Sequence, residues 1–104
     1  MYVAMNRFSV NHLRELEFEQ AWKNRKSYLD QVKGFQQFKM LKGQVNGDVR
    51  EYISETNWDS QQDFKNWTQS EQFKAAHKNK TTPPGVLTGH PKFEGFEVII
   101  SKLD

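Results

Sequence analysis

The chain has 104 residues and a formal net charge of +2, from 15 basic and 13 acidic residues mixed along its length, so we expect one domain over residues 1–104 and no nucleic-acid partner. The absence of cysteine excludes disulfides, thiolate ligands and iron–sulfur clusters, which leaves histidine and carboxylate as metal ligands. No segment approaches the ~20 apolar residues of a membrane span, and the N-terminus lacks a signal-peptide pattern, so we expect a cytoplasmic protein without a membrane partner.

The first two expected elements are a strand and a long helix. Strand-forming residues alternate loosely over Met1–Val10, where Asn6 is an exception because a polar amide suits a strand interior poorly. Two interpretations of Asn6 stay open: a bulge or edge position, or a hydrogen-bond donor aimed into a pocket. From His12 to Val32 residues recur at helical spacing, with Asn11 as the N-cap and Gly34 ending the segment.

A hairpin is expected after this helix. Phe35–Leu41 predicts a second strand, and Asn46-Gly47 is a strong hairpin-turn dipeptide. Val49–Trp58 carries the strand formers of a third strand, which should pair antiparallel with the second.

The C-terminal part predicts a broken helix, a loop and a last strand. Ser60 begins one short helix, and Thr68–Glu71 has capping-box spacing that begins another over Ser70–Asn79. Lys78–Pro91 contains proline, glycine and threonine and predicts a loop. Phe93–Ser101 predicts the final strand.

The order β-α-β-β-α-β is that of the ferredoxin-like α+β fold. Four strands with helices on one side leave the opposite face of the sheet uncovered, although the predicted strands carry apolar residues on both faces. Face-to-face packing of two copies would bury that surface, so we expect a homodimer.

Three histidines are the candidate nitrogen ligands for a metal. His12 at a helix start and His90 in the loop are interpreted as exposed polar residues. His77 differs because it shares one face of the last helix with Phe73 and Ala76. Such a histidine is structural more often than ligating, but neutral imidazole is also the usual proximal ligand of haem iron, so both interpretations stay open.

Other chemistry has little support in the sequence. The sequence contains no glycine-rich phosphate loop, no Walker motif and no plausible Ser-His-Asp set, which argues against nucleotide and acyl-transfer chemistry. Trp67 ends the first short helix, and its pattern alone indicates packing in the core with Phe64.

Nearly the whole chain resembles the IsdG-type haem-degrading monooxygenases, which belong to the antibiotic-biosynthesis-monooxygenase superfamily of dimeric α+β barrels. The residues that carry the resemblance are Asn6, Gly34-Phe35-Gln36-Gln37, Trp58-Asp59-Ser60, Phe64, Trp67, Ser70, Phe73 and Ala76-His77. The combination of Asn6, Trp67 and His77 is far more specific than the rest of the pattern, which the superfamily shares widely.

The resemblance implies catalytic roles for three residues. His77 would ligate the haem iron on the proximal side, and Asn6 would donate a hydrogen bond to oxygen on the distal side. Trp67 would press on the porphyrin and ruffle it, which exposes a meso carbon to attack. Axial ligand, hydrogen bonding and ring distortion are the means by which a protein tunes a haem.

The resemblance also implies contacts with the body of the ligand. Phe73 and Ala76 would line the pocket beside His77, while Trp22 and Arg25 of the first helix would face it. Arg25 would meet a polar or anionic part of the ligand, although a surface ion pair is an equally good interpretation of that residue.

The implied reaction is oxidative cleavage of haem at a meso carbon, which releases iron and a bilin-type chromophore. Haem would be both substrate and cofactor, oxygen the oxidant, and a separate reductase the electron donor, with one haem per subunit of the homodimer. Two alternatives stay open. One is a cofactor-free monooxygenase of the same superfamily acting on an aromatic or quinone substrate, and the other is a haem carrier or sensor that releases its ligand intact.

Overall fold

A computed structural model of the chain describes residues 1–25, 27–78 and 82–102. The strands are β1 (Tyr2–Asn11), β2 (Phe35–Asn46), β3 (Val49–Trp58) and β4 (Lys92–Glu97). The helices are α1 (Glu15–Lys23), α2 (Gln61–Thr68) and α3 (Glu71–Lys78), with 3₁₀ turns η1 (His12–Arg14) and η2 (Leu29–Gln31).

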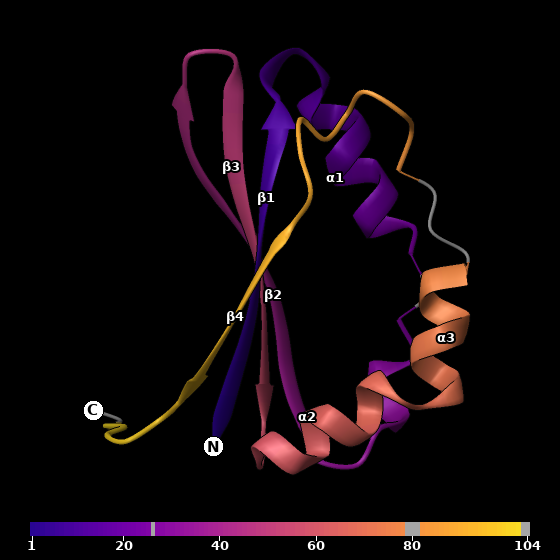
Figure 1. Ribbon diagram of the computed structural model, residues 1–104, viewed down its shortest axis with the longest axis vertical. Coiled ribbons are helices and arrows are strands. Elements are labelled where there is room, and N and C mark those ends of the chain that lie inside the picture. The colour runs from indigo at the N-terminus through magenta and orange to yellow at the C-terminus, as the bar shows by residue number, and fades with distance from the viewer. Residues whose placement is uncertain (26, 79–81, 103–104) are drawn as a thin grey trace.

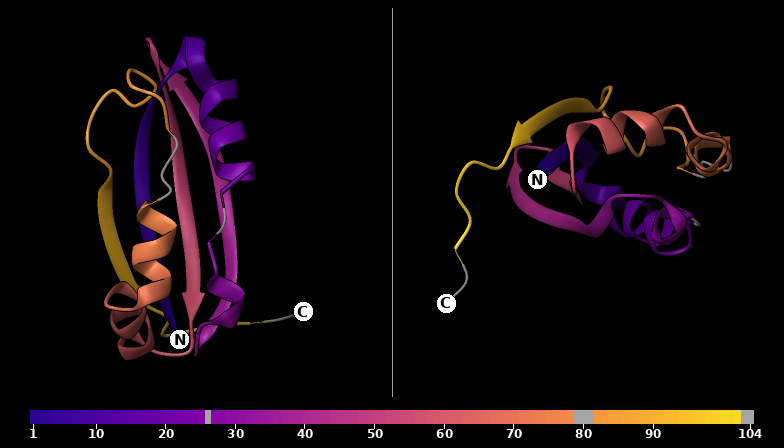
Figure 2. Two further views of the ribbon diagram at one scale, coloured as in Figure 1. Left: turned by 90° about the vertical axis from the view of Figure 1, so that its right-hand side faces the viewer. Right: turned by 90° about the horizontal axis from the view of Figure 1, so that it is seen from below.

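Within the described ranges, the strands form one antiparallel sheet in the order β2-β3-β1-β4. The helices all lie on one face of this sheet, and the other face is bare (Figures 1 and 2). This arrangement confirms the predicted ferredoxin-like α+β fold and its hairpin. No helix in the described part of the chain is long and apolar enough to cross a membrane.

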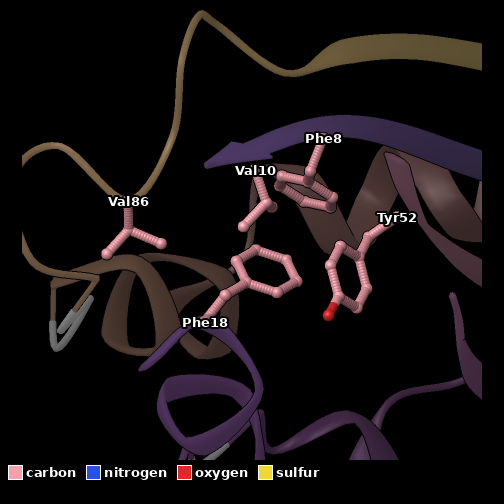
Figure 3. Packing of buried hydrophobic residues seen from close by; sticks show 5 residues of the cluster. All are labelled: Phe8, Val10, Phe18, Tyr52 and Val86. Atoms are coloured by element: carbon pink, nitrogen blue, oxygen red, sulfur yellow. The ribbon is translucent and has the colours of Figure 1, made fainter. Parts of the chain in front are cut away.

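Two clusters of buried side chains, among the residues described, hold the helices to the sheet. One consists of Phe8, Val10, Phe18, Tyr52 and Val86, where the ring of Phe18 reaches from α1 toward the strands (Figure 3). The other consists of Tyr2, Ala4, Leu29 and Trp58. Because Tyr2 pairs with Trp58 and Phe8 with Tyr52, the clusters lie at opposite ends of the β1–β3 pair.

The first helix is shorter than predicted. α1 ends at Lys23, and helical geometry returns only in η2. Tyr28 lies between them with a φ of 60°, which a continuous right-handed helix does not contain. Leu29 is nevertheless buried, because the chain turns it into the second cluster instead of extending α1. The prediction of a helix to Val32 is therefore wrong, although Asn11 does act as a cap by accepting a bond from the Leu13 amide of η1.

Two strand boundaries also differ from the prediction. β2 runs past Leu41 to Asn46, because β3 remains available as a partner up to the hairpin turn. β4 ends at Glu97 instead of Ser101, since its neighbour β1 begins only at Tyr2. After the end of β4, the Val98 amide still donates a hydrogen bond to the Met1 carbonyl.

The predicted break between the two C-terminal helices is confirmed. The Ser60 hydroxyl accepts a bond from the Asp63 amide at the start of α2. The Ser70 hydroxyl does the same for the Phe73 amide at the start of α3. The capping box assigned to Thr68 is wrong, because its hydroxyl donates instead to the Lys65 carbonyl inside α2.

The predicted loop over Lys78–Pro91 includes residues 79–81, which lie outside the described residues. In its described part Val86 is fully buried in the first cluster, and Leu87 forms an isolated bridge with Val10. This segment therefore contributes to the core despite its loop composition.

Tyr52 closes one end of the core and has an altered acidity. Its ring centre lies 4.6 Å from that of Phe18, and its hydroxyl donates a 2.5 Å hydrogen bond to Oε2 of Glu19. Burial first, and then the Glu19 carboxylate, raise the pKa of Tyr52 from 10.0 to about 12.

This shift predicts a loss of stability at alkaline pH. Between pH ~10 and pH ~12 the unfolded chain releases the phenol proton while the folded chain keeps it, so the free energy of unfolding falls as pH rises through that window. Urea unfolding at a series of alkaline pH values should show this slope in the wild type and a smaller slope in Tyr52→Phe. Equal slopes in the two proteins would contradict the assignment.

Candidate active site

A cavity of about 550 Å³ lies between the middle of the sheet and the helices, a volume in the range of small-molecule sites. The register of β1 and β3 explains why it forms. Two rows of large residues, Tyr2 with Trp58 and Phe8 with Tyr52, enclose two rows of small ones, Ala4 with Thr56 and Asn6 with Ser54. The small rows form the floor of the cavity, because they leave space that the two core clusters do not fill.

Aromatic rings form most of the walls of the cavity. They are Trp22, Phe35, Phe38, Phe64, Trp67, Phe73 and Phe93. Trp22 and Phe38 stack with ring centres 5.8 Å apart and planes at 17°, whereas Trp67 meets Phe73 edge-on at 4.8 Å. Flat apolar walls of this kind suit a flat, polycyclic ligand.

His77 lines the cavity and belongs to α3, which lies across from the sheet (Figure 1). Its Nδ1 lies 2.8 Å from the Phe73 carbonyl, and its ring stacks on the Phe73 ring with centres 3.9 Å apart. A carbonyl can only accept a hydrogen bond, so Nδ1 carries the proton and a neutral ring holds its lone pair on Nε2. This is the tautomer that a metal-ligating imidazole with a backbone partner adopts.

Trp67 belongs both to the core and to the cavity wall. Its ring centre lies 5.4 Å from that of Trp58 and 6.2 Å from that of Phe64, as the packing interpretation predicted. The same residue lines the cavity, and its buried Nε1 has no hydrogen-bond partner within the described ranges. The indole is therefore held firmly by its neighbours while one part of it faces the ligand space.

Asn6 lies in the middle of the sheet. It pairs with Ser54 of β3 on one side and with Phe93 of β4 on the other, without a register shift. The interpretation of Asn6 as a bulge or an edge position is therefore wrong. Its side chain lines the cavity and makes no hydrogen bond to any residue that the structure describes, so its amide is available to a ligand.

Arg25 follows the end of α1 and lines the cavity. Its guanidinium carbon lies 4.4 Å from the centre of the Trp22 ring, a cation–π contact that holds the charge beside the aromatic wall. Burial lowers the pKa of Arg25. The expected alternative of a surface ion pair is not observed, since Arg25 pairs with no carboxylate in the described part of the chain.

The family model described as "Antibiotic biosynthesis monooxygenase" matches residues 1–79. The chain belongs to this family. The predicted superfamily is thereby confirmed.

Relatives of the chain include haem-degrading members of the family. A haem-degrading monooxygenase of Halalkalibacterium halodurans is 29% identical over 80 residues, which cover 77% of this chain and 69% of that protein. The haem-degrader MhuD of Mycobacterium tuberculosis, solved with two haems bound in its active site, is 26% identical with a TM-score of 0.77. That match covers 98% of this chain and 99% of the MhuD chain. These relatives support the predicted resemblance to the haem-degrading branch.

The same fold also occurs in a monooxygenase of Streptomyces coelicolor, from ActVA-Orf6, solved in complex with nanaomycin D. It is 19% identical with a TM-score of 0.71, and the match covers 99% of this chain and 91% of that chain. At this identity the likeness concerns the fold alone. The fold by itself therefore does not identify the substrate.

The structure brings the seven residues predicted to form the site to one cavity. They are Asn6, Trp22, Arg25, Trp67, Phe73, Ala76 and His77. The remaining histidines lie elsewhere, as expected: His12 is exposed and pairs with Glu15, and His90 is exposed. Among the described residues no three His, Asp or Glu side chains gather as a metal site.

Sequence reasoning missed part of the cavity lining. Ser54 and Thr56 in β3 and Phe38 in β2 were assigned to strands without any role in a site. The sequence does contain a signal for Ser54 and Thr56, because they are two small polar residues between Tyr52 and Trp58 on the inward face of β3. Its meaning depends on the pairing of β3 with β1, which the sequence alone does not specify.

Proposed function

We propose that this chain is a haem-degrading monooxygenase that binds haem in the cavity and opens the porphyrin oxidatively at a meso carbon. The geometry of His77 carries the proposal. Its Nδ1 donates to the Phe73 carbonyl on its own helix, so in the neutral ring Nε2 is the nitrogen that carries a lone pair, as a metal ligand must. A single imidazole suits a metal that a porphyrin already holds, and neutral imidazole is the usual proximal ligand of haem iron.

The walls fit the rest of the ligand. Porphyrin is flat and apolar over most of its surface, as are the stacked rings of Trp22 and Phe38. Its carboxylates need a cation, and Arg25 supplies one that pairs with no acidic residue in the described ranges. The haem-degrading relatives support the same ligand.

Each catalytic residue has a distinct task in this proposal. His77 holds the iron from α3, and Trp67, braced from behind by Trp58, presses on the ring and bends it. Asn6 donates its amide hydrogen to dioxygen on the sheet side of the ring. When bound, the haem supplies the iron that activates dioxygen and the carbon that is oxidised, with electrons from an external reductase.

We further propose that two copies of the chain pair through the bare face of the sheet. Strand alternation places an apolar group there, comprising Val3, Met5, Leu41, Ile53 and Phe96. Leu41 and Phe96 are 41% and 46% exposed, which is unfavourable for a face left in water.

Absorption spectroscopy with haemin tests the proposed function. We expect the purified chain to shift the Soret band with saturation at one haem per subunit, and the band to disappear in air once a reductant is added. The same mixture under nitrogen should keep its band. An unchanged haemin spectrum would contradict the proposal and leave the cofactor-free alternative, whereas a band that survives air and reductant would indicate a carrier or sensor.

A further inference from the structure

Two polar side chains stand next to each other on the floor of the cavity. Asn6 of β1 and Ser54 of β3 are directly opposite in the register, and both line the cavity. Residues opposite each other on antiparallel strands have Cβ atoms roughly 4.5–5.5 Å apart and point to the same face of the sheet. Asn6 and Ser54 therefore face the same volume of the cavity.

The neighbours of this pair leave it without internal hydrogen-bond partners. On the strands that flank it, Ser54 pairs with Met40 and Asn6 pairs with Phe93, which are apolar. Along the strands the next inward pairs are Ala4 with Thr56 and Phe8 with Tyr52. The hydroxyls of Thr56 and Tyr52 are already hydrogen-bonded, to Trp58 and the Ala4 carbonyl and to Glu19 respectively.

The buried position of the Ser54 hydroxyl is not explained by a hydrogen bond within the described part of the protein. The residue is only 6% exposed, and its hydroxyl makes no hydrogen bond to any residue of the described ranges. Thr56, one row away on the same face, shows the ordinary arrangement: its hydroxyl accepts from Nε1 of Trp58 at 2.9 Å and donates to the Ala4 carbonyl at 3.5 Å. Buried hydroxyls are normally hydrogen-bonded, so the cavity itself must supply the partner of Ser54.

We propose that Ser54 is a ligand-binding residue of the sheet side of the site, which acts together with Asn6 on a small ligand that accepts hydrogen bonds, such as water, dioxygen bound at the iron or a small anion. The inference rests on the proposed haem function. α3, which carries His77, lies across from the sheet (Figure 1), so a flat ring held by His77 would turn one face toward α3 and the other toward the floor of the cavity. The small ligand then lies between the ring and the Asn6–Ser54 pair.

The two side chains complement each other chemically. The Asn6 amide nitrogen offers two donors in fixed directions, whereas the Ser54 hydroxyl rotates and offers one donor and two lone pairs. Asn6 can therefore stabilise negative charge on the ligand, and Ser54 can either donate to it or accept a hydrogen from it. A neutral ligand such as water needs that acceptor, and an anion uses both donors.

Azide binding to the haemin-loaded protein tests this inference without depending on turnover. The change in the Soret spectrum gives the azide dissociation constant. In Ser54→Ala we expect this constant to rise on the order of tenfold, because a hydrogen bond to a charged ligand is lost. The affinity for haemin itself should not change, since Ser54 contacts the small ligand and not the iron.

Two variants control for other effects of the substitution. Ser54→Thr keeps the hydroxyl and should bind azide like the wild type. Ser9→Ala makes the same atomic change at an exposed position of β1 and should leave azide binding unaltered. Circular dichroism of each variant checks that the fold is kept.

Each remaining outcome overturns the inference in a recognisable way. Unchanged azide affinity in Ser54→Ala would mean that Ser54 only fills space in the floor of the cavity and does not bind the small ligand. Equal losses in Ser54→Ala and Ser54→Thr, or a loss of haemin binding in Ser54→Ala, would assign it to the shape of the cavity. If the wild type binds no haemin at all, the proposed function falls, and this inference falls with it.

Discussion

Replacement of His77 by alanine should abolish the haemin-dependent Soret shift and weaken haemin binding by more than ~100-fold. The loss is this large because even the partners of a metal ligand contribute about 10- to 100-fold to affinity, and here the ligand itself is removed. The aromatic walls remain in the variant, so haemin is expected to bind weakly and without the spectrum of a histidine-ligated iron. Titration of haemin followed by absorption measures both effects.

His12→Ala and His90→Ala are matched controls for this experiment. Each removes one exposed imidazole outside the cavity lining, and we expect haemin binding like that of the wild type. Wild-type binding by His77→Ala, or a comparable loss in either control, would assign the iron ligand to another residue.

Replacement of Asn6 by alanine should leave haemin bound and reduce the rate of its degradation by ~10²-fold or more. Removal of one well-placed donor to an oxygen that gains negative charge has effects of this size. Since the Asn6 side chain makes no hydrogen bond within the described part of the protein and its backbone pairing is unaffected, the substitution removes little that holds the sheet together. The measurement is the rate of Soret loss in air with a reductant, at saturating haemin.

Asn66→Ala is the control for the loss of an amide. Asn66 is exposed on α2, where its Oδ1 accepts a bond from Gln62, and it does not line the cavity. We expect that variant to degrade haem at the wild-type rate. If Asn6→Ala also retained full activity, Asn6 would be reduced to a polar residue tolerated in a strand.

The fold could be predicted from the sequence because its signals are local. The Asn46-Gly47 turn and the alternation in Val49–Trp58 each depend on a few neighbouring residues, and both are confirmed. Helix length was not predictable in the same way. The periodic pattern continues to Val32, but Leu29 reaches the core through a turn at Tyr28 and packs with residues distant in the sequence, Trp58 among them.

Some residues of the candidate site are likewise predictable from local sequence, and others are not. His77, Phe73 and Ala76 share one short helix, so their common face follows from spacing alone. Asn6 and Ser54 are 48 positions apart in the sequence and meet only through the β1–β3 register. Ser54 therefore went unnoticed, because a serine within a strand carries no signal until its cross-strand neighbour is known.

A structure of the chain in complex with haemin tests directly whether His77 ligates the iron of a haem bound in the cavity. We predict one haem per subunit in the cavity, with Nε2 of His77 bonded to the iron and Trp67 against a bent porphyrin ring. The face of the haem opposite His77 should be turned toward Asn6 and Ser54. A haem bound elsewhere, or an iron ligated by another residue while His77 points away from it, would contradict the proposed function, although the fold would stand.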